Sequence, residues 1–122
     1  MNTMDIGTKL VALCKEGKNL EAIETLYSPD IVSVEAMSMP NMPAESRGMP
    51  AIVAKNKWWV DSHVVHSASA AGPYPHGDRF IVNFKYDITH KQSQQRMTMD
   101  EMALYQVKDG KIVREEFFYG TP

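Results

Sequence analysis

Two glutamates near the end of the chain, Glu101 and Glu115, lie in apolar runs where packing alone requires no charge. The runs, 97–107 and 111–119, flank Lys108-Asp109-Gly110 and predict two strands joined by a tight turn. Carboxyl groups that are close together inside a protein disfavour double ionisation, so one of them keeps its proton to higher pH. Such a pair suits general acid–base catalysis, although an ion pair or a place at the solvated rim would also explain either residue.

The length of the turn decides which side chains share a face, because a shift of one residue in the pairing moves every side chain to the opposite face. A two-residue turn, Asp109-Gly110, and a three-residue loop, 108–110, both fit the sequence. We favour the three-residue loop, which pairs Ala103 with Glu115 and makes Glu101 and Glu115 diagonal neighbours about 7 Å apart. The predicted pocket face then holds Met99, Glu101, Ala103, Tyr105, Val107, Val113, Glu115, Phe117 and Tyr119.

Glu35 and His66 complete the set of candidate catalytic residues. Glu35 lies in the β-branched run 31–36, where a solvated strand end would also explain it, and His66 lies in the predicted strand 63–71. His63 and His66 are three residues apart and so face opposite sides of a strand, which argues against a shared metal. No zinc-ligand spacing, phosphate loop or dinucleotide fingerprint occurs. We therefore predict no metal and no cofactor. His66 is expected to be either a surface residue or a partner of Glu35 or Glu101.

Aromatic residues on the predicted inner surface indicate an apolar pocket for a flat or cyclic molecule. Trp58 and Trp59 point about 100° apart on a helix, so only one of them turns fully inward, and core packing would also account for that ring. The stretch Met37–Pro50, rich in methionine and proline, is either a lid over the pocket or an ordinary exposed loop. The predicted substrate-binding residues are Trp59, Phe84, Tyr86, Tyr105, Phe117 and Tyr119.

The rest of the pattern predicts the elements that would position these residues. Apolar periodicity predicts a helix over 5–16, a second one from Asn19 through Leu26, and a third one from about Pro50 to Ser62. Strands are predicted at 31–36, 63–71 and 79–90, before the closing hairpin. Short helices followed by a curved antiparallel sheet predict one α+β domain over residues 1–122.

The composition argues against several kinds of partner. The net charge is −2, the isoelectric point is about 6.1 and no basic stripe occurs, so nucleic acid is not an expected partner. The first twenty residues contain no apolar run of signal-peptide or membrane length, and we predict no membrane association. The single Cys14 excludes an internal disulfide and suits a reducing compartment, so we expect a cytoplasmic protein.

The order of the predicted elements resembles the nuclear transport factor 2-like superfamily, and within it the SnoaL-like domains. Three segments carry the resemblance in their order and spacing along nearly the whole chain, namely Leu26–Val32, Arg47–Ile52 and Val107–Val113. The resemblance implies a conical, cystatin-like α+β cup, usually a homodimer, with a pocket between sheet and helices. Members include polyketide cyclases, ketosteroid isomerases, dehydratases and proteins that only bind, and the fold does not choose among these functions.

A comparison with the ketosteroid isomerases implies a general base without its usual partners. Glu35 falls where those enzymes keep their general-base aspartate. Their oxyanion tyrosine falls near Leu10 and their protonated aspartate near Met102 or Ala103, and none of these side chains donates a hydrogen bond. Because the oxyanion hole is usually the larger contribution to catalysis, we do not expect steroid isomerase activity.

Three functions remain open from the sequence. The first, slightly favoured, is cofactor-independent proton transfer on a small, mostly apolar carbonyl compound, as in an isomerase, cyclase or dehydratase. Glu35 would take a proton, and the Glu101/Glu115 pair or His66 would return one. The second is a homodimeric module that binds a small apolar or cyclic molecule without chemistry. The third is a structural dimeriser with a filled cup and an apolar outer face.

Overall fold

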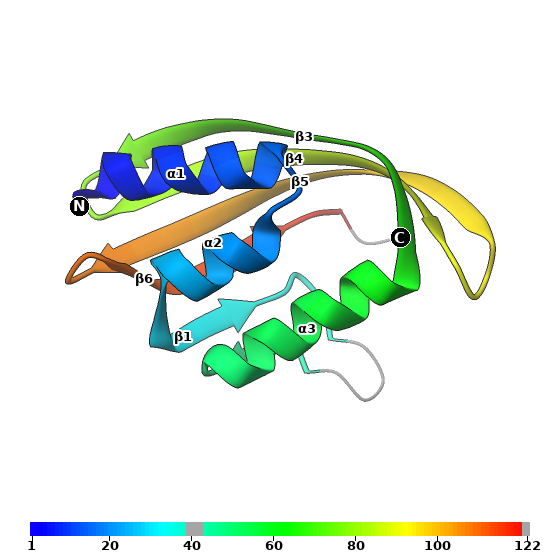
Figure 1. Cartoon of the computed structure of the whole chain (residues 1–122), viewed down its shortest axis with the longest axis horizontal. Coiled ribbons are helices and arrows are strands. Elements are labelled where there is room, and N and C mark those ends of the chain that lie inside the picture. The colour runs from blue at the N-terminus through cyan, green and yellow to red at the C-terminus, as the bar shows by residue number, and fades with distance from the viewer. Residues whose placement is uncertain (39–42, 121–122) are drawn as a thin grey trace.

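The computed structural model describes residues 1–38 and 43–120. Three helices cover one face of a six-stranded sheet that curves around them without closing (Figure 1). This α+β cup is the predicted architecture. The elements are α1 (Thr3–Lys15), α2 (Asn19–Leu26), β1 (Tyr27–Val34), β2 (Glu45–Arg47), α3 (Met49–Ser62), β3 (His63–His76), β4 (Arg79–His90), β5 (Gln95–Lys108) and β6 (Lys111–Phe118).

The strands follow the spatial order β2-β1-β6-β5-β4-β3. Neighbouring strands are antiparallel apart from β1 and β6, which run parallel, so the described sheet is mixed and not wholly antiparallel as predicted. A parallel pair needs a long connection, and here α3 and four strands separate β1 from β6 in the chain. The pairing places Ser33 directly beside Glu115, far apart in sequence.

Local signals explain where the helices begin and end. Asn2 and Asp5 form a capping box at the start of α1, and Gly17, with φ of 72°, follows its end. Gly48 precedes α3 with φ of 87°, and Pro50 occupies the first turn. These residues fix the two ends of α1 and the start of α3.

The core lies between the helices and the concave face of the sheet. Side chains alternate along β4, since Phe80, Val82, Phe84 and Ile88 are buried while Ile81 is exposed. The helices supply a matching apolar stripe, made of Ile6, Leu10, Val11, Ala22, Ile23, Leu26 and Ile52.

Several boundaries differ from the prediction. Strand β1 begins at Tyr27 and not at Ile31, and β3 continues to His76, beyond the predicted end of the strand at residue 71. Both extended segments contain prolines that their positions tolerate. Pro29 lies where the pairing of β1 is irregular, and β3 is an edge strand, where proline is tolerated. The stretch Met37–Pro50 contains the short strand β2, where a loop without pairing was predicted. The predicted lid falls partly on residues 39–42, outside the described residues.

Candidate active site

Glu115 carries a carboxyl group into the core, where only 3 % of the residue is exposed. It projects from β6 toward the helices, where the Tyr27 hydroxyl and the Ser33 hydroxyl both donate hydrogen bonds to it; the bond from Ser33 is 2.8 Å long. Burial raises the pKa of Glu115, while Tyr27, Lys55 and Ser33 act in the opposite direction. The two hydroxyls thus satisfy the acid where no solvent reaches it.

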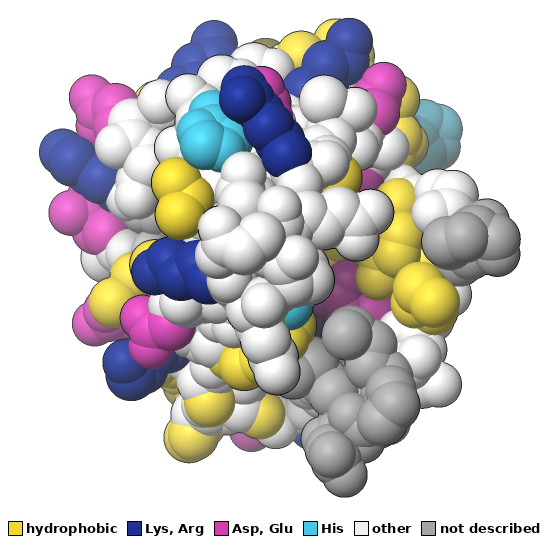
Figure 2. Space-filling view, turned by 90° about the vertical axis from the view of Figure 1, so that its right-hand side faces the viewer, with side chains coloured by type: hydrophobic (Ala, Val, Ile, Leu, Met, Phe, Trp, Pro, Cys, Tyr) yellow, Lys and Arg dark blue, Asp and Glu magenta, His cyan; other side chains and the backbone are white. Residues whose placement is uncertain are grey.

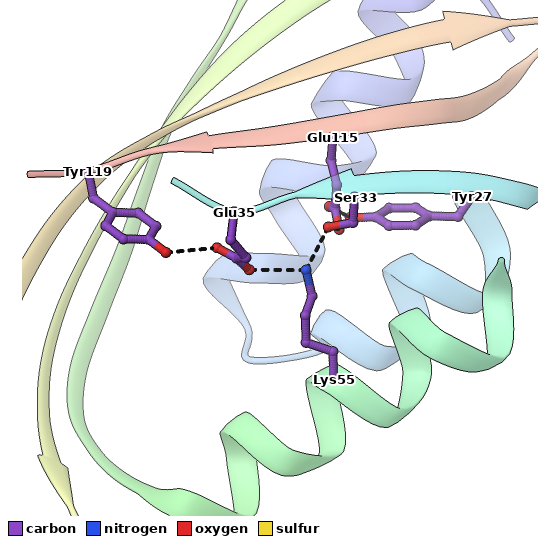
Figure 3. Close-up of polar contacts among 6 residues, drawn as sticks. All are labelled: Tyr27, Ser33, Glu35, Lys55, Glu115 and Tyr119. Carbon is purple, nitrogen blue, oxygen red and sulfur yellow. Dashed lines mark hydrogen bonds and ion pairs between the residues drawn. The ribbon is translucent and has the colours of Figure 1, made fainter. Parts of the chain in front are cut away.

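Lys55 connects this buried acid to a second carboxylate. Its Nζ, on α3, donates to Ser33 Oγ at 2.6 Å and to Glu35 Oε1 at 3.0 Å (Figure 3). The same ammonium lies 5.4 Å from the centre of the Phe117 ring, within range of a cation–π contact. One lysine therefore joins α3 to the end of β1 and, through Ser33, to β6.

Tyr119 continues the cluster toward the open end of the cup. Its hydroxyl donates to Glu35 Oε2 at 3.2 Å. Burial and the neighbouring Glu35 raise the pKa of Tyr119 to about 12, so the hydroxyl keeps its proton at neutral pH. Each oxygen of Glu35 thus accepts a hydrogen bond from a separate donor, as Figure 3 shows.

Glu101 lies on the same inner face, in β5, but in a different environment. Burial, followed by the charges of Glu35 and Glu115, raises its pKa to about 7, and Lys55 only partly opposes this. Within the described parts of the chain, no hydrogen-bond donor contacts the Glu101 carboxyl group. This group is therefore able to gain and lose a proton near neutral pH.

The hairpin closes differently from the prediction. Lys108 pairs with Lys111, which leaves Asp109-Gly110 as a two-residue turn with positive φ at both residues; the predicted three-residue loop is wrong. A bulge at Val113 then adds one residue to β6, and Glu115 consequently pairs with Tyr105.

This bulge restores the predicted common face, because one extra residue reverses the side on which the following side chains lie. Glu101 and Glu115 both face the helices, as predicted. They are not diagonal neighbours, however. The partner of Glu115, Tyr105, is four residues from Glu101, or about 13 Å along the strand. Ile112, and not the predicted Val113, is buried beside Val107.

His66 lies outside the cluster. Its ring is exposed at an irregularity in β3, and Nε2 lies 2.7 Å from Thr89 Oγ1. His63 instead stacks on Trp59, with ring centres 4.7 Å apart. The structure therefore brings together Glu35, Glu101 and Glu115 and leaves His66 apart from them.

The predicted aromatic residues divide into two groups. Phe84 and Tyr105 are buried in the core, with 4 % and 2 % exposed, and pack among other core residues. The other four, Trp59, Tyr86, Phe117 and Tyr119, are half-buried, and the ring centres of Trp59 and Tyr86 are 5.4 Å apart. Trp58 is the more exposed of the two adjacent tryptophans, as expected if only one turns inward.

Sequence reasoning missed Tyr27, Ser33 and Lys55. A signal was present for two of them. Lys55 shares a helical stripe with Ile52 and Trp59 at i, i+3 and i+7, and Ser33 shares a strand face with Glu35. A lysine on an inward stripe and a serine beside a candidate base indicate a polar cluster. Tyr27 offered no comparable signal, because a buried tyrosine fits an apolar core equally well.

The open end of the cup is visible in Figure 2, where an acidic side chain lies at the floor of a hollow that hydrophobic side chains border on one side. Two other depressions lie away from the cluster. One, of about 390 Å³, lies at the end of α3 beside Trp58, Asp61 and His90. The second, of about 190 Å³, lies on the outer face of the sheet beside Arg79 and Arg114.

The described residues also bear on metal binding and on insertion into a membrane. In 1–38 and 43–120, no three His, Cys, Asp or Glu side chains converge as a metal site requires. None of the helices described there combines the length and the hydropathy needed to cross a bilayer. The polar cluster thus consists of carboxyl, hydroxyl and ammonium groups, which move protons or bind polar atoms.

Comparison with known proteins places the chain in a family. A family model described as a SnoaL-like domain matches residues 1–119. A candidate SnoaL-like polyketide cyclase from Mesorhizobium loti is 44% identical, with a TM-score of 0.92 over 98% of this chain and 100% of that chain.

Two solved structures with lower identity share the fold. A candidate isomerase from Bacillus subtilis is 20% identical, with a TM-score of 0.78 over 98% of this chain and 90% of that chain. A hypothetical protein with a ketosteroid isomerase-like fold from Catenulispora acidiphila, in complex with trimethylamine, is 20% identical, with a TM-score of 0.74 over 98% and 88%. Among curated proteins no match was found. The resemblance inferred from the sequence is confirmed, and the chain belongs to the SnoaL-like domain family.

Proposed function

We propose that this protein catalyses cofactor-independent proton transfer on a small carbonyl compound, as an isomerase, cyclase or dehydratase. A contrast between two carboxyl groups supports the proposal. Glu35 is paired with Lys55 and accepts a hydrogen bond from Tyr119. Glu101 has no donor among the described residues, and its pKa is raised to about 7. Neighbouring carboxyl groups in such different environments take the roles of base and acid.

The proposed reaction begins at the carbon atom next to the carbonyl group. The Glu35 carboxylate removes a proton from this carbon, and the electron pair moves toward the carbonyl oxygen. Glu101 in its protonated form then delivers a proton to the product. Exchange of the two protons with solvent restores both carboxyl groups, and general acid–base catalysis of this kind typically contributes about 10²–10⁴-fold.

The half-buried rings support an apolar, flat or cyclic substrate. Trp59 and Tyr86 lie with ring centres 5.4 Å apart, and Phe117 and Tyr119 flank the lysine and the glutamate of the cluster. Aromatic walls with a few convergent polar groups are typical of small-molecule sites. The M. loti relative, a candidate polyketide cyclase at 44% identity, supports a carbonyl-bearing substrate class.

Hydrogen–deuterium exchange tests this proposal without knowledge of the natural substrate. A panel of cyclic ketones and 1,3-diketones is incubated with the protein in D₂O, and deuterium incorporation beside the carbonyl is followed by NMR. We expect the wild-type protein to accelerate exchange for at least one compound and Glu35→Gln to abolish the acceleration. Equal rates with and without protein across the panel would contradict the proposal.

A binding module without chemistry is the second candidate function. In the described residues, every fully buried polar side-chain atom has a hydrogen-bond partner, as expected of a network that only supports the fold. Such a module would bind members of the same panel with no deuterium incorporation. Glu35→Gln would then leave the affinity nearly unchanged, whereas the catalytic proposal requires loss of exchange.

We also propose that the protein is a cytoplasmic homodimer joined through the outer face of the sheet. On this face Met102 pairs with Phe118, and Ile81 pairs with Tyr74 in the neighbouring row. All four side chains are exposed, by 46 %, 48 %, 38 % and 57 %, respectively. A row of exposed apolar residues in a sheet marks an interaction surface, and a twofold axis would bury it against its own copy. The cytoplasmic location stays a prediction from the lone, half-buried Cys14.

A further inference from the structure

The proton-transfer proposal leaves one part of the cluster without a role, namely Tyr27, Ser33 and Glu115. These three residues, the buried trio, connect through Lys55 to Glu35 and Tyr119 in one continuous series of hydrogen bonds (Figure 3). We propose that the buried trio is a positioning unit that fixes the Lys55 ammonium beside Glu35, so that the base keeps its charge and its direction. This inference rests on the proposed function, in which Glu35 is the base.

Fold stability alone gives little reason for the buried trio. Tyr27, Ser33 and Glu115 are 5 %, 0 % and 3 % exposed. Burial of a carboxyl group is costly, and its hydrogen bonds at best compensate for that cost. Apolar side chains of similar shape in such places are often neutral or stabilising. Three polar groups kept together in an otherwise apolar core therefore indicate a task other than packing.

That task follows from the direction of the hydrogen bonds. Ser33 donates its only hydroxyl hydrogen to Glu115 at 2.8 Å, which turns the oxygen lone pairs of Ser33 toward Lys55. Lys55 Nζ then donates to that oxygen at 2.6 Å. A lysine side chain has a flexible four-carbon stem, and this anchor, with the Phe117 ring at 5.4 Å, restricts it to one position. Tyr27 in turn fixes the second oxygen of Glu115.

The position of Lys55 matters because other acids surround Glu35. The charge of Glu35 raises the pKa of Glu101 on β5 and of Glu115 on β6, so the three acids lie within electrostatic reach of one another. Lys55 on α3 and the Tyr119 hydroxyl after β6 favour that charge at 3.0 Å and 3.2 Å. Since charge attraction weakens with distance, an unanchored Lys55 would support the base less well and allow it to rotate.

The test observes Lys55 directly. In ¹H–¹⁵N spectra of lysine side chains, an anchored ammonium gives a separate, slowly exchanging signal, which Lys55→Met assigns by its loss. We expect the wild-type protein to show this signal. Ser33→Ala should remove or broaden it and Tyr27→Phe should weaken it, while Ser69→Ala, at an exposed position of β3, should leave it intact. An unchanged signal in both Ser33→Ala and Tyr27→Phe, or no such signal in the wild type, would overturn the proposal.

A kinetic readout complements the spectra. On a ketone that the wild-type protein exchanges, Ser33→Ala should lower the rate at saturating substrate about tenfold with little change in KM, since it disturbs the base and not the binding walls. Lys55→Arg, which keeps the charge, should retain more activity than Lys55→Met; equal loss in both variants would count against positioning by charge. The ammonium spectra need no turnover. A protein that fails to exchange deuterium but loses the Lys55 signal in Ser33→Ala therefore contradicts the proposed function and not the positioning unit.

Discussion

Lys55 Nζ lies 3.0 Å from Glu35 Oε1 and thereby joins helix α3 to the residue that follows strand β1. The side chains of this pair are 16% and 26% exposed. Two residues further along the same helix, Lys57 forms an ion pair with Asp61, with exposures of 75% and 60%. One helix thus offers a partly buried ion pair and a solvent-exposed one for direct comparison.

Replacement of Lys55 by methionine should destabilise the fold, whereas Lys57→Met should not. Removal of Lys55 leaves Glu35 and Ser33 without their donor in a partly buried cluster, and we expect a loss of about 1–3 kcal/mol. Solvent screens the exposed pair, so its loss should be small. Urea denaturation of both variants at one pH measures the difference, and equal stabilities would contradict the role given to Lys55.

Glu101 should make the fold less stable as the pH rises toward neutrality. Its pKa is raised from 4.5 to about 7, so between these values the folded protein binds more protons than the unfolded chain. Stability therefore falls as the pH rises through this window, by at most about 3 kcal/mol for a shift of this size. Glu101→Gln should lack this loss, and its stability relative to the wild type should increase between pH 5 and pH 8.

Urea denaturation at both pH values checks this prediction. Glu24→Gln, at an exposed position of α2, serves as the control and should follow the wild type. A constant difference between wild type and Glu101→Gln across the window would show that Glu101 titrates in the folded protein as it does in the unfolded chain.

The bulge at Val113 predicts that β6 tolerates the loss of this residue. After deletion of Val113, regular pairing keeps Ile112 opposite Val107 and Glu115 opposite Tyr105, so Glu115 still faces the helices. Deletion of Leu104, in the regularly paired part of β5, would instead turn Ala103 and Glu101 to the outer face, and we expect loss of cooperative folding. Thermal melts and two-dimensional NMR spectra distinguish these outcomes, and loss of cooperative folding after deletion of Val113 would contradict the account of the register.

Much of the fold follows from local pattern. The alternation from Phe80 to Ile88 and the turn at Asp109-Gly110 identify β4 and the hairpin, because period two and positive φ leave visible marks in the sequence. The bulge leaves no such mark, since Val113 suits regular pairing as well as a bulge. The prediction that Glu101 and Glu115 share a face was therefore correct, but the predicted pairing of Glu115 with Ala103 was not.

The site was harder to predict from the sequence than the fold, because it depends on contacts between distant segments. Glu35 and Glu115 were recognised as charges in apolar strands. Their connection requires the parallel pairing of β1 with β6 and the inward face of α3, and neither follows from a local pattern. Lys55 could have been suspected from the helical stripe that it shares with Ile52 and Trp59, and Ser33 from the strand face that it shares with Glu35.

The proposed dimer should depend on the outer face of the sheet. Phe118→Asp places a charge in the exposed apolar row and should convert a dimer into a monomer, because burial of unpaired charge at an interface is costly. Lys85→Asp, on the same face of β4 but outside that row, is the matched control. Light scattering coupled to gel filtration gives the mass of each variant, and a monomeric wild-type protein would contradict the proposal.

The central claim is that Glu101 gives a proton while Glu35 takes one, and the pH dependence of deuterium exchange tests it most directly. With an active ketone from the panel, the wild-type rate should fall as the pH rises above about 7, because Glu101 then loses the proton that it must donate. Glu101→Gln should be slower by about 10²-fold or more and should lack this fall, while Glu24→Gln should match the wild type. A Glu101→Gln variant with the wild-type rate and pH profile would contradict the assignment.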